Sequence, residues 1–116
     1  MEYGMKLYSD SFDMIKKGRK DIEIRLNDEK RKNISVGDII TFTNIDTAEN
    51  ITTKCVNLYK AKSFVELFDL INDNERVGSL KSETYEEMSE QMREYYPKEQ
   101  EEKYGVLGIE FVILTM

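Results

Sequence analysis

The residues of this sequence best suited to chemistry are three charged side chains, Lys20, Glu23 and Arg25. They fall in the stretch 18–25, Gly-Arg-Lys-Asp-Ile-Glu-Ile-Arg, whose second half alternates apolar and charged residues as a half-buried strand does. Side chains two positions apart share a face of a strand, so Glu23 and Arg25 should lie together, with Lys20 at the strand entrance. A carboxylate between two cations could bind a phosphate or a base edge, or activate water. The alternative is a solvated face with a surface ion pair.

Each of the three side chains has both a binding role and a catalytic role open to it. Lys20 could act as a nucleophile or base in its neutral form if burial or nearby cations favoured that form, and otherwise contacts a phosphate or carbonyl oxygen. Glu23 could orient a ligand, or act as a general base for water. Its two cationic neighbours should lower the pKa of Glu23, so we expect Glu23→Gln to weaken ligand binding and leave the fold intact. Arg25 offers a planar fork suited to a phosphate or a base.

Tyrosines could complete a binding site around these charges. Tyr8 follows the first predicted strand and could stack on a base, although a place in the core or at a rim fits it equally well. Tyr95, Tyr96 and Tyr104 could form an aromatic rim. Two other sets are interpreted as structural, namely a core stripe at helical spacing (Met88, Met92, Tyr95) and a solvated acidic run (Glu99, Glu101, Glu102).

Composition narrows the classes of function. The chain has 116 residues, which predicts one domain over 1–116, and 34% of them are charged, as in a globular protein. It has no histidine and a single cysteine, Cys55, so a Ser-His-Asp or Cys-His nucleophile is absent and we expect no metal and no cofactor. No signal-peptide segment or long apolar run is present, which predicts a cytoplasmic protein that binds no membrane.

Charge bears on the type of nucleic acid that could bind. The net charge of −6 makes duplex DNA an improbable partner, because broad duplex binding needs many phosphate contacts. Eight lysines and arginines between positions 16 and 32 nevertheless predict a local basic edge, opposite an acidic region at 83–102.

The pattern along the chain predicts the α+β class. Strands are expected at 5–8, 21–26, 51–59 and 104–114. A further strand should follow a tight turn at 37–38 and end at residue 42. The last strand should bend at Gly105 or Gly108. Helices are expected from Ser9 or Asp10 to residue 17, after Ser63 to 71, and from Thr84 to Pro97, while 72–82 and 98–103 are expected to be irregular and solvated. The simplest arrangement is a small, mostly antiparallel β-barrel of five or six strands, closed by peripheral helices.

Several of these stretches resemble one family. Residues 18–25 fit the Gly-x-Lys-x-x-Glu-x-Arg signature of the ASCH domain, a member of the PUA-like β-barrel superfamily. The resemblance extends to the glycine-aspartate turn and strand at 36–42, to the helix start at 63–67, and to the closing segments 95–97 and 104–110. It implies a PUA-like barrel that binds single-stranded RNA or a nucleotide in a cleft lined by Lys20, Glu23 and Arg25.

The same resemblance leaves enzymatic alternatives open. Some bacterial members are similar to an amidohydrolase that deacylates acetylated cytidine; these keep the signature lysine, have a threonine where this chain has Glu23, and use a glutamate from a later helical region. Glu83, Glu86 and Glu87 all lie in that region. Other members cleave RNA, so a nuclease is a further alternative, as is a module that only binds proteins.

Overall fold

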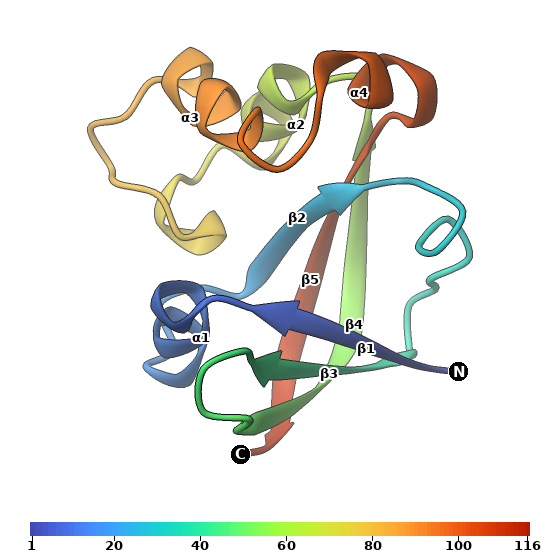
Figure 1. Ribbon diagram of the computed structural model, residues 1–116, viewed down its shortest axis with the longest axis vertical. Helices are drawn as coiled ribbons and strands as arrows, with labels where there is room; N and C mark the ends of the chain where they lie inside the picture. The colour runs from blue at the N-terminus through green and yellow to red at the C-terminus, as the bar shows by residue number, and fades with distance from the viewer.

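The computed structural model describes residues 1–116 and contains one five-stranded, curled sheet (Figure 1). The strand order is β1-β3-β4-β5-β2, with β1 and β3 parallel and all other neighbours antiparallel. The sheet is an open half-barrel, so the predicted α+β class and the small, mostly antiparallel barrel are confirmed. The strands are β1 (Glu2–Leu7), β2 (Ile22–Leu26), β3 (Ile39–Asn44), β4 (Asn50–Ala61) and β5 (Val106–Thr115).

The two edge strands, β1 and β2, leave a seam in the half-barrel because no backbone ladder joins them. A side chain crosses this seam: the Arg25 guanidinium of β2 donates a hydrogen bond of 2.8 Å to the backbone oxygen of Lys6 in β1. An unpaired strand edge must satisfy its polar groups in another way. The seam is therefore the part of the sheet where side chains, and not backbone bonds, hold neighbouring strands together.

The helices gather mainly over one end of the sheet (Figure 1). They are α1 (Ser9–Lys16), α2 (Phe64–Ile71), the short 3₁₀ helix η1 (Glu75–Val77), α3 (Tyr85–Met92) and α4 (Lys98–Tyr104). Ser63 and Thr84 cap α2 and α3 as predicted, and Thr84 forms a reciprocal capping box with Glu87. Gly18 follows α1 with a φ of 76°, the left-handed conformation expected where the chain turns toward β2.

Two apolar clusters form the interior. The first lies between α1 and the sheet and contains Phe12, Phe42 and Phe111, with Cys55 fully buried among them. The second joins β2 to α2 and α3 through Ile22, Phe64 and Met88, among others. The strand β2 is thus covered by helices on its apolar face, which fixes the orientation of its charged side chains. No helix in the structure combines the length and apolarity needed to span a membrane.

Three local predictions were wrong. The N-cap of α1 is Tyr8, because the Ser9 hydroxyl donates instead to Asp46 at 2.6 Å. The segment expected to be a solvated charge run forms α4, and the Glu101 side chain is only 3% exposed because its carboxylate accepts the backbone N–H of Phe64 at 2.7 Å. The segment 72–82 is not wholly irregular, since it contains η1.

The expected bend near the last strand occurs at Gly105. Its φ of 73° ends α4 and sends the chain into β5, and a Cβ atom there would lie 3.0 Å from the backbone oxygen of Ala61. Both the left-handed conformation and the close approach of β4 require glycine at this position.

Candidate functional site

A cavity of about 190 Å³ opens at the seam, between the edge strands and the helices α2 and α3. Its walls come from three parts of the chain, two of them near the N-terminus and the third beyond residue 67. The β1–α1 wall consists of Lys6, Leu7, Tyr8 and Ser11; the β2 wall of Lys20, Glu23, Ile24 and Arg25; and the helical wall of Phe68, Val77, Ser79, Met88, Gln91, Met92, Tyr95 and Tyr96. All four predicted binding residues, Lys20, Glu23, Arg25 and Tyr8, are therefore brought together in one cavity.

The β2 wall holds a compact triad of charges. The Lys20 ammonium lies 2.8 Å from Glu23 Oε1, and the Arg25 guanidinium lies 2.8 Å and 2.9 Å from Glu23 Oε2 through two of its nitrogens. Lys20 and Glu23 are 6% and 5% exposed, so the triad is not the solvated strand face of the alternative interpretation. Arg25 also reaches Lys6 across the seam, which ties the triad to the opposite wall.

The Glu23 carboxylate has no free acceptor site in this arrangement. Oε1 accepts the Lys20 ammonium and, at 3.2 Å, the backbone N–H of Ile24, while Oε2 accepts two nitrogens of Arg25. An ionised carboxylate has about four acceptor directions in total. Glu23 therefore serves as the anchor that holds Lys20 and Arg25 in place, and their remaining N–H groups are the ones available to a ligand.

The ionisation of the triad follows from this geometry. Burial by itself would raise the pKa of Glu23, but attraction and hydrogen bonds from Lys20 and Arg25 outweigh burial and lower that pKa to about 2. The lowered pKa agrees with the expectation from sequence. For Arg25, burial acts to lower the pKa, while the Glu23 charge and, to a smaller extent, Tyr96 raise it above its ordinary value.

This lowered pKa predicts a loss of stability in acid. Glu23 binds its proton more weakly in the folded chain than in the unfolded one, so its stabilising contribution is complete above pH 4.5 and disappears as the pH falls toward about 2. We expect the free energy of unfolding, measured with urea at pH values from 7 to 2.5, to fall by about 3 kcal/mol more than in a Glu23→Gln variant. An equal fall of the free energy of unfolding in both proteins would contradict the lowered pKa of Glu23.

Aromatic rings border the mouth of the cavity. Tyr8 and Tyr95 are 60% and 54% exposed, and their ring centroids lie 6.1 Å apart although the residues come from opposite walls. Tyr96 also lines the cavity, whereas Tyr104 packs against the second apolar cluster and belongs to no rim. The residues Met88 and Met92, assigned to the core from their spacing, contribute to the apolar cavity wall as well.

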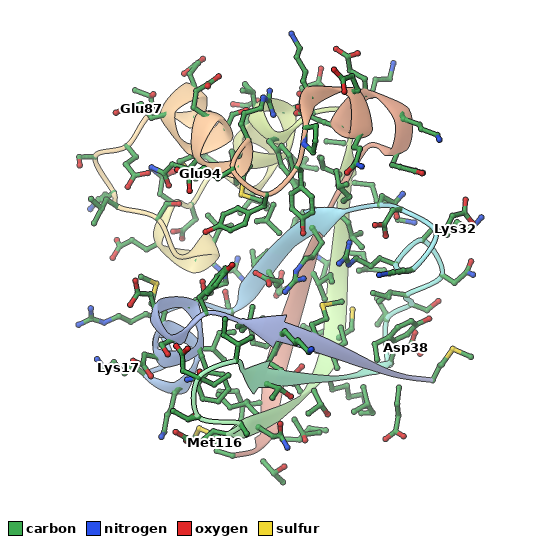
Figure 2. The ribbon with its side chains drawn as sticks, viewed as in Figure 1. Lys17, Lys32, Asp38, Glu87, Glu94 and Met116 are labelled. Atoms are coloured by element: carbon green, nitrogen blue, oxygen red, sulfur yellow. The ribbon has the colours of Figure 1, made fainter.

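None of the three glutamates considered for a third site position lines the cavity. The Glu87 side chain accepts the backbone N–H of Thr84 and lies on the outer side of α3, away from β2 (Figure 2). Glu83 contacts the cavity only indirectly, through a hydrogen bond of 2.9 Å from the side-chain amide of Gln91. The sequence interpretation missed Gln91, although its position one turn after Met88 on the same helix was a signal that it could share the Met88 face.

The expected basic edge is largely neutralised. Five of its eight cations form ion pairs with carboxylates: Lys16, Lys20, Arg25, Arg31 and Lys32. Lys17 and Lys32 moreover lie on opposite sides of the molecule (Figure 2). Of the six edge cations outside the cavity, Lys16, Arg31 and Lys32 are paired with carboxylates, so half of that part of the edge is neutralised. The structure also contains no cluster of three or more acidic, cysteine or histidine side chains arranged to hold a metal ion.

Comparison with known proteins identifies the fold family. The family model described as the ASCH domain matches residues 5–115. The crystal structure of hypothetical protein PH0355 is 34% identical, with a TM-score of 0.85, and the match covers 98% of this chain and all of that one. The solution structure of protein PF0455 from Pyrococcus furiosus is 33% identical, with a TM-score of 0.75 and 98% of both chains covered.

A third structure, an ASCH domain from Lactobacillus crispatus JV V101, is 16% identical and shares the fold, with a TM-score of 0.68 over 99% of this chain and 80% of that one. No curated protein matches this sequence. The family model spans nearly all of the strands and helices that form the seam cavity. The chain therefore belongs to the ASCH domain family.

Proposed function

We propose that this protein binds a nucleotide, either free or within single-stranded RNA, in the seam cavity. The observation that supports this most is the charge of the lining. Three cations (Lys6, Lys20, Arg25) and one carboxylate (Glu23) give the lining a charge of 3 − 1 = +2, whereas the whole chain carries −6. A cationic cleft in an acidic protein attracts anionic ligands to that one place.

The parts of a nucleotide match different walls of the cavity. The N–H groups of Lys20 and Arg25 that Glu23 leaves free suit phosphate or carbonyl oxygens, and Glu23 fixes the position of both cations. Exposed rings of Tyr8 and Tyr95 at the mouth can stack on a base, which contributes about 1–3 kcal/mol per base in single-strand binding. Apolar side chains of α2 and α3 cover the remaining surface.

The size of the site supports a small ligand footprint. A cavity of about 190 Å³ is below the usual 300–1,000 Å³ of pockets that enclose drug-sized molecules. A bound strand would therefore place one or two nucleotides in the cavity. Duplex DNA, which relies on many phosphate contacts, is disfavoured for the same reason.

Binding fits the triad better than hydrolysis does. Glu23 is the only carboxylate in the cavity lining, and all its acceptor directions are occupied, so it is poorly placed to take a proton from water. The amidohydrolase pattern of the family has a threonine at the position of Glu23 and a further glutamate, and here no such glutamate lines the cavity.

Titration with labelled single-stranded RNA, nucleoside monophosphates and duplex DNA tests this proposal. We expect single-stranded ligands to bind more tightly than duplex, and log K to fall with log salt with a slope of about −0.7 to −1.4, the value for one or two phosphate contacts. Arg25→Ala should weaken binding by roughly 1–3 kcal/mol. The exposed Arg19, outside the lining, provides the matched control Arg19→Ala, which should bind normally. Equal or tighter duplex binding would refute the preference.

Incubation with acetylated cytidine and with a mixed RNA pool distinguishes binding from catalysis. A binding protein releases no cytidine and leaves the RNA intact. Release of cytidine that Lys20→Ala abolishes would replace the binding function with the amidohydrolase, and RNA cleavage with the same dependence would replace it with the nuclease.

A further inference from the structure

We propose that Gln91, held by Glu83, is a specificity-determining residue that accepts a hydrogen bond from an amino group of the bound base. This inference rests on the proposed nucleotide binding and extends it from the class of ligand to the choice of base. It predicts that the cavity prefers cytosine, which has an exocyclic amine, to uracil, which has a carbonyl oxygen at the same position.

The orientation of the Gln91 amide follows from its partner. Gln91 Nε2 lies 2.9 Å from Glu83 Oε2. An ionised carboxylate only accepts hydrogen bonds, so the NH₂ group of the amide must face Glu83 and cannot exchange places with the carbonyl oxygen. Because Gln91 lines the cavity and Glu83 does not, the carbonyl oxygen is the acceptor that this side chain can present to a ligand.

Glu83 is itself anchored, so the amide has a rigid support. Its backbone oxygen accepts the side-chain amide of Asn74 at 2.8 Å, and its backbone N–H donates to the oxygen of Leu80 at 3.1 Å. The same Asn74 amide donates to Leu80 as well, at 2.9 Å. These bonds tie the start of α3 to the loop after η1, and they hold Glu83 where it can fix Gln91.

The two facing walls then offer opposite hydrogen-bonding character. The β2 wall presents N–H groups of Lys20 and Arg25, and the acceptors of Glu23 are all used. The α3 wall presents the amide oxygen of Gln91. The serine and tyrosine hydroxyls of the lining can either donate or accept, so they do not select between bases.

A base that spans the cavity must therefore present acceptors at one edge and a donor at the other. Cytosine has an amino group at N4 where uracil has a carbonyl oxygen. Toward the Gln91 oxygen, an amino group makes a hydrogen bond, whereas a carbonyl oxygen leaves two acceptors facing each other.

Calorimetric titration with cytidine 5′-monophosphate and uridine 5′-monophosphate tests the inference. We expect cytidine 5′-monophosphate to bind about tenfold more tightly than uridine 5′-monophosphate, because only its amino group satisfies the Gln91 oxygen. Gln91→Leu should abolish this preference. Glu83→Gln, which allows the Gln91 amide to turn over, should reduce it.

Glu86→Gln is the matched control, because Glu86 is an exposed carboxylate near the start of α3 outside the seam cavity, and it should keep the full preference. Binding of both nucleotides with equal affinity, or a preference that survives Gln91→Leu, would overturn the inference and leave nucleotide binding intact. Absence of binding by both nucleotides would overturn the proposed function and the inference with it.

Discussion

Replacing Glu23 with glutamine should lower the free energy of unfolding by roughly 3–5 kcal/mol, the usual effect of removing one partner from a buried ion pair. The substitution leaves Lys20 and Arg25 close together with no anion between them, in a site where Glu23 is only 5% exposed. The glutamine NH₂ group would also face at least one cation as a second donor. Urea unfolding at pH 7, followed by circular dichroism, measures the change.

An exposed pair in the same protein provides the control. Glu29 and Lys32 form an ion pair of 2.7 Å in which the Glu29 side chain is 74% exposed, so Glu29→Gln should change stability by less than about 1 kcal/mol. The strand pattern alone predicted that Glu23→Gln would spare the fold, whereas burial predicts the reverse. If the Glu23 and Glu29 variants unfold at the same urea concentration, the triad is not a stabilising element.

The second large effect is expected for Glu101→Gln, which should cost roughly 2–4 kcal/mol. The Glu101 carboxylate is 3% exposed, accepts the first backbone N–H of α2 from Phe64, and forms an ion pair of 2.6 Å with Arg93. It therefore joins α4, α2 and the segment after α3 at one point. A glutamine of the same shape has one acceptor and one NH₂ group, so it cannot accept from both partners.

The neighbouring Glu102 is exposed and provides the control, since Glu102→Gln should leave the urea midpoint almost unchanged. Comparison of the two variants also tests whether helix packing depends on Glu101. Amide hydrogen exchange of Phe64 should accelerate in the Glu101 variant and stay slow in the Glu102 variant. Unchanged protection of Phe64 in both would mean that the hydrogen bond contributes little.

The sequence alone predicted the features that depend on residues only a few positions apart in the chain. Alternation along 21–26 predicted that Glu23 and Arg25 share a face, because successive side chains of a strand point to opposite faces. The start of α3 could be predicted from Thr84, because a capping box depends on residues only three apart. The left-handed turn at Gly18 follows from the same kind of short-range constraint.

Burial could not be predicted in the same way. Whether the charged face of β2 meets water or a cavity depends on the segment from α2 to Tyr96, which lines the opposite wall and is distant from β2 in the sequence. Glu101 shows the same limit: its surroundings in sequence are charged and suggest a solvated face, but its partner Phe64 lies far away along the chain. The spacing of Gln91 from Met88 could have placed both on one helix face, but its hydrogen bond to Glu83 could not be predicted from that spacing.

The position of β2 in the sheet also determines when the seam cavity can form during synthesis of the chain. Its only neighbour is β5, and Glu23 lies opposite Ile109, so 109 − 23 = 86 residues separate the two in sequence. At about 5–20 residues per second, a ribosome needs roughly 4–17 s to add them. During that interval β2, which carries Glu23 and Arg25 and follows Lys20, has no partner strand. The seam cavity and the five-stranded sheet therefore form in one late step, and a nascent chain that lacks β5 has neither.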